Sequence, residues 1–378
     1  MSIRVERKVQ AAIVGAVLWT LSAGAALCHA QEDSTAPSAD ASSEEHAGEG
    51  VSFRTTNVIP NVRVHPEYPR KMQELGKEGW SQMCLCIEPD GHVANPRVID
   101  HSGAGEFDEA ALSAVRKWKY SPQLVNGEPT ERCEVAVVLR FSLSDKDGAT
   151  RSFAVDINRI RPLIQSGKLD EAEEILKGLE PSNGYEMGRA SFARAALAYA
   201  RHDLRAEATA LEDILRNPSV EDALKTNVLR SAFDAHVELS QISAALDDFA
   251  ELKKREGDKL SEPVRAAGAQ LLAAVASDVP LATSAVLSKR YAPCANDAAW
   301  TAKLLRRTFA LEHATEDLDR VVIACEGHGY EGKFAPDREW RIPADWGACR
   351  LTVFGAEGAT FTLMEYSEGS QATSAPLP

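Results

Sequence analysis

The chain has 378 residues, of which 44% are hydrophobic and 26% charged, so it is long enough for two or three domains with apolar cores. The formal net charge is -14, and Lys and Arg form no extended cluster. Proteins that wrap nucleic acid or bind anionic lipid surfaces need such clusters, so we expect no nucleic-acid partner.

The N-terminus has the pattern of an export signal. Three basic residues precede an uncharged apolar run over residues 9–27. Small residues then favour cleavage after Ala30. The alternative is that residues 1–30 remain as an N-terminal membrane anchor, because the run is close to the ~20 residues that span a bilayer. A lipid anchor on Cys28 is disfavoured because bulky Leu27 precedes it. Both main interpretations place the bulk of the chain outside the cytoplasm.

Residues 31–56 are rich in Ser, Ala, Glu and Asp and have few large apolar side chains. Such a composition cannot bury enough surface to order itself, so it predicts a disordered acidic linker.

Residues 57–146 have the pattern of a small α+β unit. Ser81, Met83, Leu85 and Ile87 alternate on one face of a strand, and a helical stripe from Phe107 follows. The expected elements are a helix at 70–75, strands at 80–88 and 92–100, a helix at 107–118 and a strand at 131–143.

This unit carries seven short motifs in a characteristic order: Pro66–Pro69, Gly76–Gly79, Ile87–Val93, Phe107–Leu112, Val115–Trp118, Asn126–Pro129 after Pro122, and Phe141–Leu143. Together they resemble the C-terminal domain of the TonB family. The resemblance implies an αββαβ fold with a three-stranded antiparallel sheet and both helices on one face. It also implies that the last strand pairs with an extended peptide of a partner, through Glu134, Val135, Ala136, Val137, Val138, Leu139, Arg140 and Phe141.

The same resemblance implies a periplasmic location and protein partners in the cell envelope, such as an outer-membrane receptor or inner-membrane motor proteins. Energy-transducing TonB proteins have a long Pro-rich spacer, whereas Pro37 stands alone in this linker. That departure weakens the case for force transmission.

Residues 155–278 have a helical pattern with a recurring turn. Leu169, Leu204 and Ile242 begin similar phrases 35 and 38 residues apart, near the ~34 of tetratricopeptide repeats, which this region resembles. Two to three helical hairpins are expected, stacked as a short solenoid whose concave face binds peptides. The alternative is a generic helical spacer.

Residues 280–366 change to short alternating runs separated by turns, which predicts a β-rich C-terminal domain. Trp300, Trp340 and Trp346 suit its core. We expect residues 367–378 to be a disordered tail. The expected strands are Leu304–Leu311, Leu318–Cys325, Glu339–Ile342, Cys349–Phe354 and Thr360–Tyr366.

Six cysteines remain after the signal segment, and an even number in an exported chain favours disulfides. Cys86–Cys133 is the first expected pair, although the strand parity of the two residues requires a bulge. Cys325–Cys349 is the second. Cys84 and Cys294 then form a cross-domain pair or stay free. A copper site at Cys84, Cys86 and His92 is a further alternative, disfavoured because no other ligand is placed.

The sequence contains no phosphate loop, nucleophile elbow or metalloprotease motif. We therefore predict no catalytic residues, no metal site and no cofactor. The expected function is that of a non-enzymatic TonB-family envelope protein that binds partner proteins through the TonB-like domain, in energy-coupled transport across the outer membrane. The alternative is a periplasmic assembly scaffold or adaptor whose helical repeats bind the partner.

Overall fold

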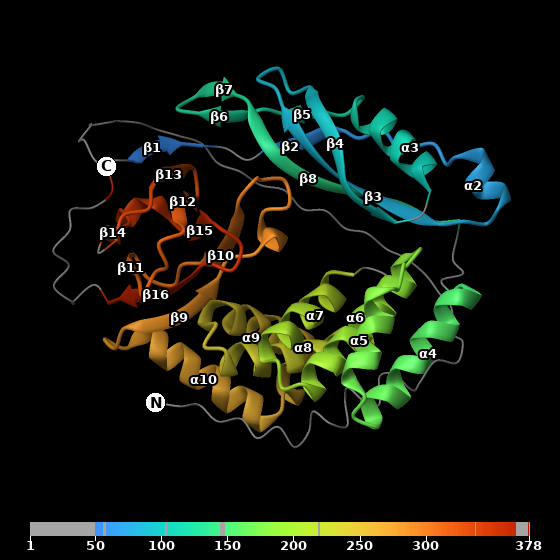
Figure 1. Cartoon of the computed structure of the whole chain (residues 1–378). Coiled ribbons are helices and arrows are strands. Elements are labelled where there is room, and N and C mark those ends of the chain that lie inside the picture. The colour runs from blue at the N-terminus through green and yellow to red at the C-terminus, as the bar shows by residue number, and fades with distance from the viewer. Residues whose placement is uncertain are drawn as a thin grey trace.

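A computed structural model describes residues 50–55, 58–102, 104–143, 148–217, 220–336, 338–367 and 377. They form three modules, which Figure 1 shows around a common centre: a first module (residues 58–143), a helical module (residues 151–276) and a β module (residues 281–366). The fold class is α+β, as expected. The predicted signal or anchor, residues 1–30, lies outside the described residues. Within the described ranges, no helix combines the length and apolar surface needed to cross a membrane.

The first module is built on an antiparallel sheet with the strand order β4-β3-β8. The predicted strands and helices are present, with ends that differ by at most three residues. Four short strands were not predicted and pair as β2 with β5 and β6 with β7. The elements are β2 (Ile59–Val62), α2 (Arg70–Glu74), β3 (Gly79–Ile87), β4 (Val93–Ser102), α3 (Gly105–Val115), β5 (Lys119–Ser121), β6 (Gln123–Val125), β7 (Glu128–Thr130) and β8 (Arg132–Phe141).

Both helices of the first module cover the same face of the sheet. Met83, Leu85 and Ile87 of β3 are buried with Phe107 of α3 in one core, as their alternation predicts. Trp118 closes this core, and its indole Nε1 donates a hydrogen bond of 2.8 Å to the Val64 carbonyl. The opposite face of the sheet, which we call the open face, is therefore free of these helices.

The helical module consists of three helical hairpins and a last helix. Gly167, His202 and Ser240 each have a positive φ in the turn of a hairpin. They occupy equivalent places, which agrees with the sequence period. Membership of the tetratricopeptide family stays a prediction. The helices are α4 (Arg151–Gln165), α5 (Leu169–Lys177), α6 (Gly184–Ala200), α7 (Leu204–Arg216), α8 (Asp222–Glu238), α9 (Ile242–Glu256) and α10 (Glu262–Ala276).

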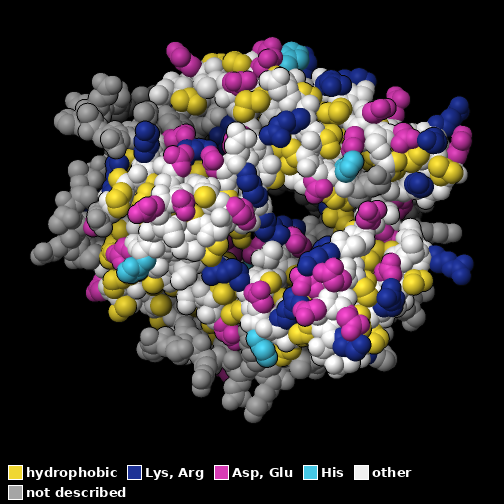
Figure 2. All heavy atoms as spheres, in the orientation of Figure 1, with side chains coloured by type: hydrophobic (Ala, Val, Ile, Leu, Met, Phe, Trp, Pro, Cys, Tyr) yellow, Lys and Arg dark blue, Asp and Glu magenta, His cyan; other side chains and the backbone are white. Residues whose placement is uncertain are grey.

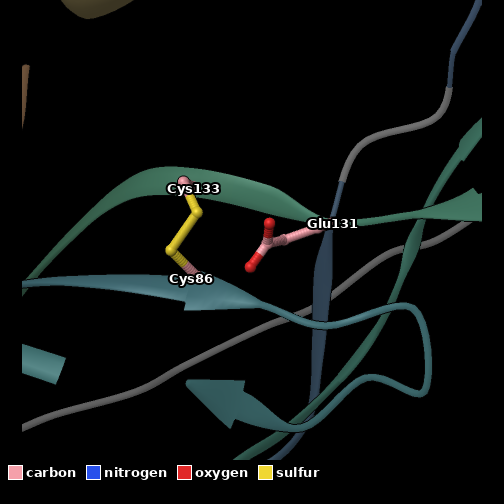
Figure 3. Close-up of side chains that lie close together, drawn as sticks. All are labelled: Cys86, Glu131 and Cys133. Carbon is pink, nitrogen blue, oxygen red and sulfur yellow. A yellow bond between two sulfur atoms is a disulfide. The ribbon is translucent and has the colours of Figure 1, made fainter. Parts of the chain in front are cut away.

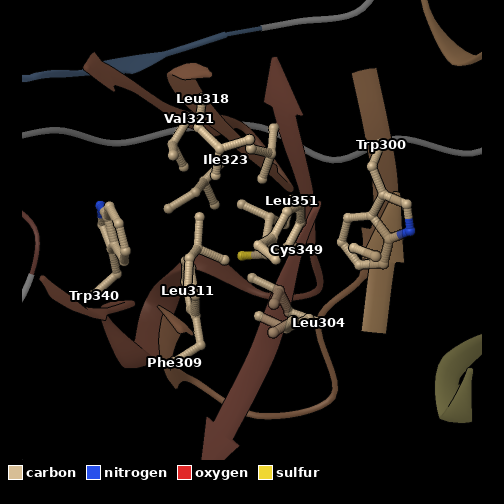
Figure 4. Packing of buried hydrophobic residues seen from close by; sticks show 14 of the residues in the cluster. Trp300, Leu304, Phe309, Leu311, Leu318, Val321, Ile323, Trp340, Cys349 and Leu351 are labelled. Atoms are coloured by element: carbon tan, nitrogen blue, oxygen red, sulfur yellow. The ribbon is translucent and has the colours of Figure 1, made fainter. Parts of the chain in front are cut away.

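The β module has two antiparallel sheets, with the orders β1-β13-β12-β15-β10 and β14-β11-β16-β9. The three predicted tryptophans are buried in its core, and Figure 4 shows Trp300 and Trp340 there. The strands are β9 (Leu281–Val286), β10 (Ala298–Lys303), β11 (Thr308–Glu312), β12 (Leu318–Cys325), β13 (His328–Lys333), β14 (Glu339–Arg341), β15 (Cys349–Gly355) and β16 (Thr360–Tyr366).

Several expectations for the β module were wrong. Residues 304–307 are not strand, because the backbone amides of Leu305 and Arg306 donate instead to the buried carboxylate of Glu365 at 2.7 and 3.0 Å. Strands β9, β10 and β13 were missed, since small residues and glycines weaken their pattern. Leu377, in the predicted disordered tail, is buried and donates to the Arg341 carbonyl at 2.8 Å.

The end of the predicted disordered linker is also ordered. Gly50–Arg54 form strand β1, which pairs antiparallel with β13 from Gly50 opposite Gly332 to Arg54 opposite His328. The open edge of β13 supplies the backbone partners, and the linker's own composition gives no sign of them. The chain therefore contributes a strand to the β module before it enters the first module.

Candidate partner-binding strand

Strand β8 lies at an edge of the first module's sheet (Figure 1). Among the residues that the structure describes, its one neighbouring strand is β3, with which it pairs from Phe141 opposite Gly79 to Arg132 opposite Ile87. The backbone groups of an antiparallel strand point alternately to its two sides, so about half of those of β8 point away from β3. A further strand can bind these groups.

The predicted binding residues alternate between the two faces of the sheet. Leu139 and Phe141 are buried in the core, and Val135 and Val137 pack against it. Ala136, Val138 and Arg140 lie on the open face and are exposed, Val138 at 48% of its surface. Strand β8 therefore combines an anchored inner side with a free edge.

The start of β8 is irregular. Glu134 has a φ of 61°, and the pairing with β3 shifts between Leu85 and Ile87. This is the bulge that the strand parity required, and it brings Cys86 and Cys133 together in a disulfide with a Cα–Cα distance of 3.9 Å. The disulfide fixes the register of β8 on β3.

Figure 3 shows the Glu131 carboxylate beside this disulfide. The two sulfur atoms are bonded to each other, so neither is a thiolate, and one carboxylate is not a metal site. Cys84 is also in a disulfide, with Cys294. The pairing removes both thiolates that the copper alternative needs. The third disulfide joins Cys325 and Cys349 within the β module.

The Cys84–Cys294 disulfide joins the open face of β3 to the β module, with a Cα–Cα distance of 5.5 Å. Beside it, Arg97 Nη2 of β4 donates a hydrogen bond of 2.7 Å to the Cys294 carbonyl. The first module is therefore held covalently to a loop that lies 210 residues further along the chain.

A cleft of about 920 Å³ lies between the open face and the helical module. Trp80, Val138 and Arg140 form its wall on the sheet, and Met187 and Arg194 of α6 form part of the opposite wall. In Figure 2 an opening separates the first module, in the upper part of the view, from the helical module below it. The side chains of β8 on the open face thus point into a cleft that residues of all three modules line.

The helical module has a buried charged cluster of its own. His236 of α8 contacts Asp248 of α9 through Nδ1 at 2.6 Å and Glu212 of α7 through Nε2 at 3.4 Å. Burial alone would lower the pKa of His236, but the hydrogen bonds to the two carboxylates outweigh it and raise the pKa to about 9. Burial raises the pKa of the Asp248 carboxyl. The cluster ties three helices together as a structural ion network.

Sequence reasoning identified Val138 and Arg140 but missed the residues across the cleft. Met187 and Arg194 belong to a helix of another module, and nothing in the sequence of that helix marks them as facing a sheet. The one sequence signal for this neighbourhood is the unassigned pair of cysteines, Cys84 and Cys294, which left a cross-domain contact open.

The comparison with protein families matches residues 64–143 to the family described as Gram-negative bacterial TonB protein C-terminal. The protein TonB of Vibrio cholerae serotype O1 is 26% identical over 111 residues, which are 28% of this chain and 45% of that protein. TonB of Escherichia coli strain K12 is 29% identical over 80 residues, covering 21% and 32%. TonB of Xanthomonas campestris pv. campestris is 30% identical over 97 residues, covering 26% and 41%.

The match thus spans less than half the length of each of these relatives. Among solved structures, the solution structure of the Pseudomonas aeruginosa TonB C-terminal domain is 26% identical, with a TM-score of 0.22, and covers 24% of this chain and 89% of that domain. TonB2 of Vibrio anguillarum is also 26% identical, with a TM-score of 0.20, and covers 30% of this chain and 100% of the other. Residues 64–143 of this chain therefore match the TonB C-terminal family, and a helical module and a β module follow them.

Proposed function

We propose that this protein is a non-enzymatic partner-binding protein of the cell envelope, located in the periplasm, and that it binds an extended segment of a partner protein along β8. The observation that carries the proposal is that β8 is an edge strand in a TonB C-terminal domain, with β3 as its one neighbour among the described residues. Such an edge binds a peptide through main-chain hydrogen bonds, with side chains at alternate positions giving specificity.

The position of β8 favours a role in partner binding over a purely structural role as the last strand of the sheet. Its register is fixed by the Cys86–Cys133 disulfide at one end and by buried Leu139 and Phe141 at the other. A preorganised edge loses little conformational entropy when a partner strand is added. The exposed Ala136 and Val138 leave its open face accessible.

A role in energy-coupled transport across the outer membrane is the wider part of this proposal. The TonB C-terminal domain supports it. The matched part is about a quarter of the chain, and the single Pro37 of the linker contrasts with the Pro-rich spacer of energy-transducing TonB proteins. We therefore propose partner recognition as the main task of the domain, and force transmission as a role that it does not need.

Photo-crosslinking in cells tests strand addition. A photoreactive residue at Ala136 of the full chain should capture a partner, and one at Leu272, which is 54% exposed on α10, is the matched control. Neighbouring amides of a strand point to opposite sides, so one of Val137→Pro and Val138→Pro removes a hydrogen bond to β3 and the other removes a donor from the free edge. The variant that loses only the free-edge donor should keep the fold, and it should lose the crosslink at Ala136. If this folded variant still captures the partner through Ala136 as efficiently as the unchanged chain, strand addition is contradicted.

The second candidate is the scaffold, and one observation favours it. A cavity of about 770 Å³ lies between helices α5 to α7 and the β module, and Arg205 and Tyr291 are among its lining residues. A partner held there should be lost from the Arg205→Glu variant but kept by the edge variants of β8. The two candidates therefore predict opposite results for the same pair of substitutions.

A further inference from the structure

We propose that the cleft between the open face and α6 selects the partner of β8, and that it favours a strand with acidic side chains on the face turned toward the cleft. This inference rests on the proposed function, because the ligand reaches the cleft by pairing with β8. The helical module then acts as a specificity wall for the TonB C-terminal domain rather than as an independent binding site.

Strand geometry directs the partner's side chains into the cleft. Neighbouring strands lie about 4.8 Å apart, and the side chains of each strand alternate between the two faces of the sheet. Every second side chain of a strand added to β8 therefore lies level with Val138 and Arg140 on the open face. Both of these residues line the cleft, so the added side chains enter the same space.

The far wall of the cleft is a regular helix face. Met187, Ser191 and Arg194 are four and three residues apart on α6, so they lie along one stripe of the helix, and all three line the cleft. The Cys84–Cys294 disulfide holds the sheet against the β module at the neighbouring part of the open face. The β module is in turn held to α7 by the Arg290–Asp213 ion pair, so the two contacts together limit how far the walls can separate.

The charge of the cleft is opposite to that of the whole chain. Five cationic side chains line it against three carboxylates, whereas the chain has a net charge of -14. The cations are Arg140, Arg194, Arg216, Lys289 and Arg290, and the carboxylates are Asp100, Glu180 and Asp213. Such a local excess attracts an acidic ligand.

Three of these cations have no acidic partner among the described residues. Arg290 Nη1 pairs with Asp213 at 2.8 Å and Arg216 with Glu212 at 2.7 Å, whereas Arg140, Arg194 and Lys289 form no ion pair there. Asp100 and Glu180 are not paired with a cation either, but Asp100 lies on β4, two strands away from β8, and Glu180 lies after α5 in the helical module. Arg140 is on β8 itself and is therefore the nearer charge to an added strand.

The test uses two synthetic peptides, one alternating valine with glutamate and one alternating valine with lysine. Each presents one kind of charge on a single face when it is extended. We expect the full-length protein to bind the glutamate peptide about tenfold more tightly, which is the scale of two partly exposed ion pairs. The double variant Arg140→Glu, Arg194→Glu should lose or invert this preference. Arg116→Glu with Lys117→Glu, exposed at the end of α3 on the other face of the sheet, makes the same change in net charge and should leave it intact.

Deuterium exchange of the β8 amides in the same samples distinguishes strand addition to β8 from selection of an acidic strand by the cleft. If both peptides bind with equal affinity and both protect β8, strand addition is supported and the selectivity of the cleft is overturned. Equal effects of the Arg140 and Arg116 variant pairs overturn it as well, because the preference then follows net charge alone. Binding of the glutamate peptide without protection of β8 contradicts strand addition itself. Circular dichroism confirms that each variant is folded.

Discussion

The disulfide between Cys84 and Cys294 predicts a large and specific loss of stability when it is removed. It joins residues 210 positions apart and connects two modules, whereas Cys325–Cys349 spans 24 positions inside one module. The perturbation is the double substitution Cys84→Ala, Cys294→Ala, in which alanine keeps the buried sites apolar. The matched control is Cys325→Ala with Cys349→Ala.

The magnitude follows from loop closure in the unfolded chain. A loop of 210 residues gives about 5 kcal/mol, and one of 24 residues gives about 3 kcal/mol. The Cys86–Cys133 disulfide shortens the larger loop, but the dependence is logarithmic and the correction is only about 0.2 kcal/mol. The variant without Cys84–Cys294 should therefore lose more free energy of unfolding than the control.

Guanidinium denaturation followed by tryptophan fluorescence measures both losses. Trp80 and Trp118 report on the first module, and Trp300, Trp340 and Trp346 report on the β module. A single transition is expected for the native chain, since the disulfide couples the modules. The reasoning is refuted if the Cys84 variant loses less free energy of unfolding than the control. The modules would then unfold independently, and the disulfide between them would not stabilise either one.

Three further predictions concern single residues. Gly91→Ala should destabilise the first module by about 3 kcal/mol or more, because the added Cβ would lie 2.0 Å from the Tyr120 carbonyl oxygen. Gly127→Ala, with a similar positive φ but open space, should cost about 1 kcal/mol, so equal melting temperatures for the two variants would contradict the close contact. The pKa of His236 is raised from 6.5 to about 9, so protonated His236 stabilises the folded chain. This contribution to the free energy of unfolding is complete below pH 6.5 and is lost as the pH rises to about 9. The loss is up to about 3 kcal/mol. His236→Asn should flatten this pH dependence of the free energy of unfolding, and an unchanged slope in that variant excludes the histidine as its source.

Strong local patterns allowed much of the fold to be predicted. The alternation from Ser81 to Ile87 and the helical stripe from Phe107 each specify one face, and the structure buries those faces against each other. The parity of Cys86 and Cys133 required a bulge, and the structure has one at Glu134. In each of these cases the residues that carry the pattern also form the contact that they predict.

The remaining features depend on partners that are distant in sequence. Strand β1 forms because β13 offers an edge, and the acidic linker gives no sign of it. The cleft needs Arg140 of one module and Arg194 of another, and only the tertiary arrangement brings them to one space. The sequence therefore allowed the binding strand to be predicted, but not the cleft that this strand forms with α6 of the helical module.

The most direct test of partner binding at β8 is amide deuterium exchange of the full-length protein, alone and with the partner captured through Ala136. The account predicts that alternate amides between Val135 and Phe141 become protected, because only the outward-facing groups gain hydrogen bonds. It also predicts little change in α10, which lies outside the cleft. Protection confined to α5, α6 and α7, with β8 exchanging as in the free protein, would contradict it.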